Sequence, residues 1–266
     1  MRIKVISPHG FCGGVDRAIR IAKQTIEDNP PPVYCLHEIV HNQSVVQELS
    51  AKGMRFVDAV EDVPDGSVMI VSAHGASPHV FDVATSRGIH VVDATCPFVA
   101  AVHRRIRDNF SNGMRTVVIG EPKHAEVCGY LGEPGACLPK DVKAGERYDT
   151  VVQTTLDSSA HKGVCTATRD RQRAVREFVG RCRDSSSVGV LVVGGMNSSN
   201  SRRLVETAEG AGAAAWLVDS AHGVATLSFS GVDVLGVTSG ASTPEYVLES
   251  VVSSLPNGSS VQEDIH

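Results

Sequence analysis

The sequence predicts an α/β protein of three pseudo-equivalent α/β units with mainly parallel sheets, and two patterns support this prediction. Short runs rich in β-branched residues alternate with segments of helical periodicity, and turns rich in Gly, Ser, His or Thr separate them. This alternation is typical of βα units. Residues 188–193 form a nearly continuous apolar run, as expected of a strand that is covered on both faces.

Nine segments have the composition of strands, and helical patterns follow most of them. Val15, Ala18, Ile19 and Ala22 recur at the i, i+3, i+4, i+7 spacing of an amphipathic helix. The predicted strands cover residues 3–7, 33–36, 68–72, 90–93, 116–120, 151–155, 188–194, 214–218 and 234–238. Further helices are expected over residues 45–49, 78–87, 98–109, 169–183, 199–209 and 243–255.

The succession of strands and helices recurs about three times and so predicts three units. A first α/β unit spans residues 13–96, with an N-terminal strand inside residues 1–12. A shortened middle unit spans residues 97–164, and a third α/β unit spans residues 165–253. The polar tail, residues 254–266, is expected to be frayed.

The composition excludes several classes of protein. Of the 266 residues, 42% are hydrophobic and 21% are charged, which provides for a sizeable core and argues against disorder. Lys and Arg number 25 against 30 Asp and Glu, so no polybasic surface is expected for nucleic acid or an anionic membrane. Aromatic residues make up only 5%, which argues against stacking platforms for single-stranded nucleic acid.

The sequence also predicts the cellular compartment. No apolar stretch approaches the roughly 18 residues that span a bilayer, and the first residues run directly into a predicted strand. Seven scattered cysteines, an odd number, fit a reducing compartment better than a disulfide framework. We therefore expect a cytoplasmic protein with no membrane partner.

Three cysteines lie where predicted strands end and helices begin, the edge at which open α/β sheets bind ligands. Cys12, Cys96 and Cys165 occupy such junctions, about one per predicted unit. Their repeated placement favours a shared metal or cofactor over three unrelated packed thiols. The paired short spacings typical of structural zinc sites are absent, whereas an iron–sulfur cube held by three thiolates would leave one iron without a protein ligand. The other four cysteines, Cys35, Cys128, Cys137 and Cys182, are expected to be small hydrophobic residues, although Cys128 lies two residues beyond Glu126 and could alternatively face the site.

Polar side chains form a second group at these junctions. His41, His74 and His124 each follow a predicted strand, and Glu126 is a candidate proton donor or, alternatively, a surface salt-bridge residue. Hydroxyl and amide groups lie in the third unit, at Ser198, Ser199, Asn200 and Ser242. Together these groups are suited to a phosphate or diphosphate. No P-loop and no G-x-G-x-x-G fingerprint follows the first strand, which argues against ATP and dinucleotides.

Nine motifs in order identify a family resemblance. They are HGFCGGVDRAI (9–19), HEIVHN (37–42), SAHG (72–75), DATCP (93–97), HAEV (124–127), QTTL (153–156), CTATRDRQ (165–172), NSSNS (197–201) and GASTP (240–244). In this order the motifs resemble the 4-hydroxy-3-methylbut-2-enyl diphosphate reductase family of the non-mevalonate isoprenoid route. The resemblance covers about residues 1–250.

The resemblance implies a fold, a cofactor and a reaction. It implies three α/β units around a central [4Fe–4S] cluster with one open iron, held by Cys12, Cys96 and Cys165. It implies a diphosphate pocket formed by His41, His74, His124, Ser198, Ser199, Asn200 and Ser242, and a proton-delivery pair formed by Glu126 and Thr154. The implied reaction is reductive dehydroxylation to isopentenyl and dimethylallyl diphosphates, with electrons from a ferredoxin or flavodoxin.

The sequence departs from the family pattern in its middle unit, and two alternatives stay open. The stretch between His124 and Cys165 is shorter than the family pattern, so a helix is expected to be missing or replaced within residues 156–164. Thr166 stands where the family often has tyrosine. One alternative is a zinc-dependent hydrolase of a phosphorylated small molecule, with the metal held by the three histidines and Glu126. The other is a non-catalytic relative that binds the diphosphate without reducing it.

Overall fold

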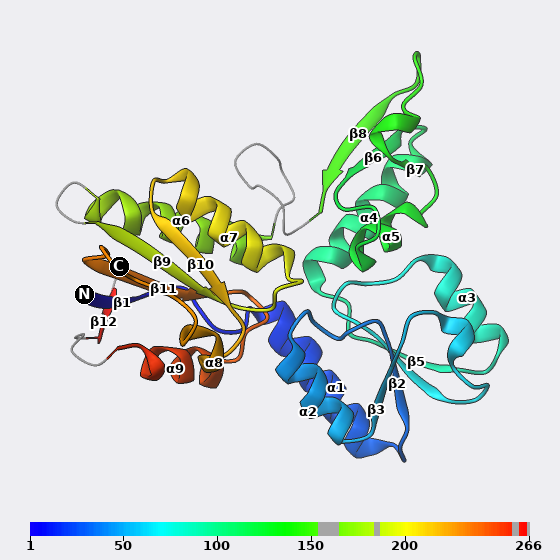
Figure 1. Ribbon diagram of the computed structural model, residues 1–266. Coiled ribbons are helices and arrows are strands. Elements are labelled where there is room, and N and C mark those ends of the chain that lie inside the picture. The colour runs from blue at the N-terminus through cyan, green and yellow to red at the C-terminus, as the bar shows by residue number, and fades with distance from the viewer. Residues whose placement is uncertain (154–164, 184–186, 257–260, 265–266) are drawn as a thin grey trace. The chain divides into compact units, whose positions relative to one another are not determined.

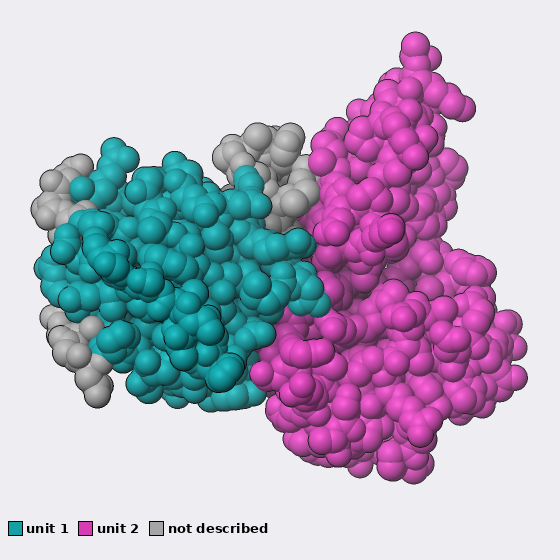
Figure 2. All heavy atoms as spheres, in the orientation of Figure 1, with its two compact units in different colours: residues 1–12, 165–266 teal, residues 13–164 magenta. Residues whose placement is uncertain are grey.

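The computed structural model describes residues 1–153, 165–183, 187–256 and 261–264, and these form three parallel sheets with flanking helices (Figure 1). The chain divides into two compact units (Figure 2). One unit contains residues 1–12 and 165–266, and the other contains residues 13–164. The predicted α/β class with parallel sheets is confirmed. No helix among the described residues is long and apolar enough to cross a membrane.

The unit of residues 1–12 and 165–266 is built on a five-stranded parallel sheet with the order β10-β9-β11-β1-β12. Its strands are β1 (Arg2–Ile6), β9 (Val188–Val193), β10 (Ala214–Val218), β11 (Val234–Ser239) and β12 (Val261–Asp264). Its helices are α6 (Thr166–Cys182), α7 (Ser199–Gly210), α8 (Ala221–Val224) and α9 (Glu245–Ser254).

Strand β9 shows why this sheet is apolar on both faces. Val190 and Val192 pack with residues of α6 and α7, whereas Leu191 and Val193 pack with residues of α8 and α9. Successive side chains of a strand point to opposite faces, so a strand between two helical layers needs apolar residues at every position. The continuous run that the sequence shows at residues 188–193 follows from this requirement.

The unit of residues 13–164 contains two smaller parallel sheets, with the orders β3-β2-β4-β5 and β7-β6-β8. The strands of the first are β2 (Val33–Leu36), β3 (Met54–Val57), β4 (Val68–Val71) and β5 (His90–Asp93), with α1 (Gly13–Asp28), α2 (Gln43–Ala51), η1 (Val60–Asp62) and α3 (Pro78–Ser86). The strands of the second are β6 (Arg115–Ile119), β7 (Ala136–Cys137) and β8 (Tyr148–Val152), with α4 (Pro97–Ser111), α5 (Ala125–Leu131) and η2 (Pro139–Asp141).

The structure differs from the predicted organisation at the N-terminus. Strand β1 pairs in parallel with β11, so the predicted N-terminal strand belongs to the sheet of the third unit and not to residues 13–96. Local periodicity identifies a strand but carries no information about a partner more than 200 residues away. Strands β3, β7 and β12 were not predicted, and β12 lies in the tail that was expected to be frayed.

Candidate functional site

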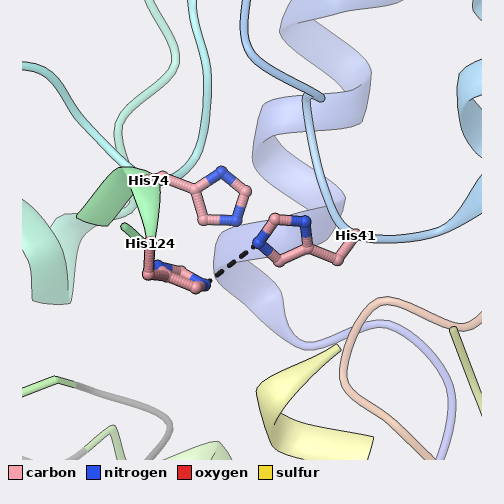
Figure 3. Close-up of side chains that lie close together, drawn as sticks. All are labelled: His41, His74 and His124. Carbon is pink, nitrogen blue, oxygen red and sulfur yellow. Dashed lines mark hydrogen bonds between the residues drawn. The ribbon is translucent and has the colours of Figure 1, made fainter. Parts of the chain in front are cut away.

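Three histidines meet at the carboxyl ends of strands in the unit of residues 13–164 (Figure 3). His41 follows β2, His74 follows β4, and His124 follows β6 as the N-cap of α5. Their ring nitrogens lie within 4.8 Å of one another. The ring centroid of His41 lies 4.3 Å from the ring centroid of His74 and 4.9 Å from that of His124. The structure thus brings together three residues that the sequence placed in one group of candidate site residues.

Hydrogen bonds determine which ring nitrogens carry protons in two of these histidines. The backbone N–H of Glu126 donates to Nδ1 of His124 at 3.2 Å, which leaves the ring proton of a neutral His124 on Nε2. His124 Nε2 lies 3.0 Å from His41 Nε2, and His41 Nδ1 lies 3.2 Å from Glu38 Oε2. The carboxylate accepts from His41 Nδ1, so His41 Nε2 accepts the proton of His124.

His74 is held as a neutral imidazole. Burial lowers its pKa well below the usual value, and the neighbouring His41 and His124 lower it further. Its Nδ1 lies 3.3 Å from the Ser72 hydroxyl. The cluster therefore combines hydrogen-bond donors and acceptors with little fixed charge, which suits either an anionic ligand or a metal ion that binds imidazole.

Glu126 is buried next to this cluster and has a partner that the sequence analysis missed. Its side chain is on α5, with the residue only 2% exposed, and its Oε1 accepts a hydrogen bond from the Tyr130 hydroxyl at 3.1 Å. Burial raises the pKa of Tyr130 well above 10, and Glu126 raises it further, so the phenol keeps its proton. The i, i+4 spacing of the two residues was the available signal, because such pairs face each other on a helix.

Cys96 lies in the same unit as the histidines, in a position that depends on a glycine. It is the N-cap of α4, whose first residue is Pro97. A Cβ atom added to Gly14, at the start of α1, would lie 2.5 Å from the Cys96 sulfur. Glycine at this position therefore leaves space for the thiol, a feature in keeping with a sulfur ligand whose position matters.

Cys12 and Cys165 belong to the other unit, together with a buried arginine. The Cys12 amide donates to the Ala241 carbonyl at 3.1 Å, and Cys165 is the N-cap of α6. Burial raises the pKa of the Cys165 thiol. The backbone amides at the start of α6 lower this pKa, and the neighbouring Cys12 raises it. Among the described residues none of the three cysteines forms a disulfide, and all three are half-buried. Two thiols close to a buried cation fit a site that holds thiolates as metal ligands.

The predicted hydroxyl and amide groups of the third unit lie at the ends of β9 and β11. Ser198 caps α7, and its hydroxyl accepts from the Ser201 amide at 3.3 Å. Asn200 is 5% exposed, yet its side-chain oxygen and nitrogen have no partner among the described residues. An unpaired buried amide is costly, which makes Asn200 a candidate ligand-binding residue. Ser242 is also buried, and Ser199 is half-buried. Thr154 lies outside the described residues.

The remaining cysteines differ in their surroundings. Cys35 is fully buried in β2, and burial strongly raises its pKa, as expected of a small hydrophobic residue. Cys137 is also buried and Cys182 is half-buried. Cys128 is exposed, and its thiol donates to the Pro122 carbonyl at 3.3 Å.

Sequence comparisons connect this chain to enzymes of known name. A 4-hydroxy-3-methylbut-2-enyl diphosphate reductase of Aeromonas hydrophila is 40% identical over 287 aligned positions, which cover 96% of this chain and 91% of the relative. The reductase of the same name from Acinetobacter baylyi is 41% identical, with 96% of this chain and 90% of the relative covered. Each alignment is longer than the 266 residues of the chain, so the relatives contain residues with no counterpart here.

Solved structures agree with the sequence comparisons. The E-1-hydroxy-2-methyl-but-2-enyl-4-diphosphate reductase from Plasmodium falciparum matches with a TM-score of 0.90 at 28% identity, covering 100% of this chain and 92% of that chain. The structure of an (E)-4-hydroxy-3-methyl-but-2-enyl diphosphate reductase, described as the terminal enzyme of the non-mevalonate pathway, matches with a TM-score of 0.67 at 28% identity. That match covers 96% of this chain and 99% of the other.

The fold and the histidine cluster define an α/β protein with a group of polar side chains at the carboxyl ends of parallel strands. Residues 3–256 match the family described as LytB protein. The chain belongs to this family.

Proposed function

We propose that this chain is a 4-hydroxy-3-methylbut-2-enyl diphosphate reductase, which removes the allylic hydroxyl of its substrate and forms isopentenyl and dimethylallyl diphosphates. The observation that carries the proposal is the cluster of His41, His74 and His124 beside the buried Glu126, in a chain 40% identical to reductases of that name. The reaction takes up two electrons and two protons and releases one water molecule.

We propose that Cys12, Cys96 and Cys165 hold a [4Fe–4S] cluster with one iron that has no protein ligand. The half-buried placement of the three thiols and the space that Gly14 leaves beside Cys96 support this assignment. Such a cluster supplies electrons and a Lewis-acidic iron to the reaction. The electrons come from a ferredoxin or flavodoxin in the cytoplasm.

The histidines bind and orient the diphosphate. The hydrogen-bond chain from Glu38 to His124 fixes the imidazole protons, and the Nε2 proton of His124 is the one that a phosphate oxygen can accept in place of His41. Ser198, Ser199, Asn200 and Ser242 supply further donors, and the unpaired amide of Asn200 supports this role. Holding the diphosphate at one end limits the positions of the hydroxyl at the other, which lowers the entropic part of the barrier.

Glu126 delivers the proton with which the hydroxyl leaves as water. Its burial excludes bulk water, and the Tyr130 hydroxyl fixes its Oε1 atom. Thr154 completes the proton-delivery pair, as the family resemblance implies. The second proton adds to the allyl anion that two-electron reduction leaves, and the carbon that receives it decides between the two products.

A zinc-dependent hydrolase is the second candidate, because the three histidine nitrogens are close enough together to hold one metal ion. The two candidates differ in what they require. The reductase needs iron and a reductant, and it yields a dehydroxylated product with its diphosphate intact. The hydrolase needs neither and releases phosphate.

The testing experiment uses the full chain, purified without oxygen, with the hydroxymethylbutenyl diphosphate and dithionite. We expect isopentenyl and dimethylallyl diphosphates, with no product when dithionite is omitted. Glu126→Gln should bind substrate normally and lose turnover by about 10²-fold or more, because the side chain keeps its shape but no longer has an acidic proton to donate. Phosphate release by zinc-loaded protein without reductant would overturn the proposal, and cluster and substrate binding without turnover would identify a non-catalytic relative.

A further inference from the structure

A buried guanidinium lies between the two cysteine-bearing segments of the unit of residues 1–12 and 165–266. Arg171, on α6, is only 3% exposed. Its Nη2 donates to the Gly10 carbonyl at 2.7 Å, and its Nη1 donates to the Ala167 carbonyl at 3.2 Å. Gly10 is two residues before Cys12, and Ala167 is two residues after Cys165. One side chain therefore ties the loop of one cysteine to the helix start of the other.

Among the residues that the structure describes, the charge of Arg171 has no carboxylate partner. Both of its hydrogen-bond acceptors are neutral carbonyls, its Nε has no partner, and within the described ranges it forms no ion pair. The adjacent Asp170 points its carboxylate to Arg173 instead, at 3.5 Å. A buried cation without a counter-charge is strongly unfavourable, so this position indicates a nearby negative charge that the folded, loaded protein supplies.

The groups that would act on Arg171 with a negative charge when ionised are Cys12, Cys165 and Asp170. Burial lowers the pKa of Arg171, while Cys12 and then Cys165 raise it more than Asp170 does. Thiolates that hold a metal cluster keep their negative charge permanently, and so they can balance the guanidinium whenever the cluster is bound.

The loop that Arg171 holds is also fixed from its other side. Gly10 has φ +70°, which favours glycine, and its amide donates to the Ser239 hydroxyl at 2.8 Å. A Cβ atom at this position would lie 2.6 Å from Glu245 Oε2. The Gly10 carbonyl is therefore held in place to receive the guanidinium.

We propose that Arg171 is a positioning residue that balances the charge of the Cys12 and Cys165 thiolates, holds their two segments together and raises the reduction potential of the bound cluster. Reduction adds an electron to an already anionic group, and a buried positive charge nearby stabilises the added charge. The inference rests on the proposed function in one respect, namely that Cys12 and Cys165 are cluster ligands.

The test separates charge from hydrogen bonding in the full chain with its cluster. Arg171→Gln keeps a hydrogen-bond donor without the charge, and Arg171→Lys keeps the charge without the two-pronged donor. Arg173→Gln, an exposed residue of the same helix, is the matched control. The reduction potential is measured by a redox titration followed by electron paramagnetic resonance, and cluster stability by the rate of iron loss to a chelator.

We expect Arg171→Gln to make reduction of the cluster at least tenfold less favourable, which lowers the reduction potential by about 59 mV or more for one electron. The potentials of Arg171→Lys and Arg173→Gln should stay close to that of the unchanged protein. Both Arg171 variants should lose iron faster than Arg173→Gln. An unchanged potential in Arg171→Gln would overturn the inference. If that variant does not fold, iron loss from Arg171→Lys at the rate of the unchanged protein would overturn it instead.

A further variant separates this inference from the proposed function. Cys165→Ser should bind less iron, and full iron content in that variant would reject the ligand assignment itself. A lower iron content in Cys165→Ser, together with an unchanged reduction potential in Arg171→Gln, would reject only the role of Arg171.

Discussion

The Nε2 atom of His124 donates to the Nε2 atom of His41 across 3.0 Å, joining imidazoles from two different sheets of one unit. The direction of this bond follows from its neighbours, since the Glu126 amide occupies Nδ1 of His124 and Glu38 accepts from Nδ1 of His41. A single proton lies between the two rings, and a bound phosphate oxygen would compete for it. His124 thus has two separable functions, as helix cap and as donor.

Two substitutions at His124 distinguish these functions. Asparagine is a good N-cap residue and alanine is not, so His124→Ala should lower the free energy of unfolding by about 1 kcal/mol, while His124→Asn should lower it much less. Both should weaken binding of inorganic diphosphate by about tenfold, because both remove the imidazole donor. Urea unfolding and isothermal calorimetry measure the two effects. Normal diphosphate binding by both variants would exclude His124 from the ligand site.

Tyr130→Phe tests the hydrogen bond to Glu126. The phenol keeps its proton and stabilises the ionised carboxylate, so its loss favours the protonated form of Glu126. We expect the alkaline limb of the kcat–pH profile to move up by about one to two pH units, since a hydrogen bond to a charged group contributes about 1.5–3 kcal/mol. The exposed Tyr246 provides the control, Tyr246→Phe, which should leave the profile unchanged. An identical profile for both variants would contradict the assignment.

Gly14→Ala tests the space beside Cys96. The added Cβ would lie 2.5 Å from the sulfur, so the thiol has to move. We expect iron affinity to fall about tenfold or more, as is usual when a group supporting a metal ligand is altered. Gly13→Ala is the matched control, because a Cβ at Gly13 meets nothing within 4 Å. Equal iron affinity in the two variants would show that Gly14 has no role in positioning Cys96.

His74 predicts a dependence of stability on pH. Its pKa is lowered in the folded protein, so the unfolded chain takes up the proton first as the pH falls. The contribution of His74 to the free energy of unfolding is therefore fully present above the pKa of the unfolded chain, about 6.5. It decreases as the pH falls toward the lowered pKa of the folded protein. His74→Gln should flatten the decrease in the free energy of unfolding between about pH 7.5 and pH 5. The exposed His79 gives the control, and a slope shared by His74→Gln, His79→Gln and the unchanged protein would contradict this account.

The sequence predicted most of the fold because buried strands have a strong local pattern. The runs at residues 68–72 and 188–194 became β4 and β9, whose side chains are almost entirely buried. Strand β7 has two residues and β12 is polar, so neither has such a pattern. The pairing of β1 with β11 depends on contacts between the two ends of the chain, which local periodicity does not encode.

The candidate site shows the same division. His41, His74 and His124 were predicted from their places after strands, because parallel strands bring their carboxyl ends to one edge. The roles of Tyr130 and Arg171 were not predicted. In the sequence, Tyr130 resembles an ordinary aromatic residue of the core, and Arg171 resembles an exposed cation on the surface of a helix. Their burial and their partners become visible only in three dimensions.

The most direct test of the central claim is iron and sulfide content after purification without oxygen. We expect about four irons and four sulfides per chain, with a brown colour, and a marked loss of both in Cys12→Ser, Cys96→Ser and Cys165→Ser. Cys182→Ser should keep the full content, because this half-buried residue of α6 packs against the apolar core of the unit of residues 1–12 and 165–266. A colourless protein that contains zinc, or a full cluster in all four variants, would contradict the assignment of these three cysteines as its ligands.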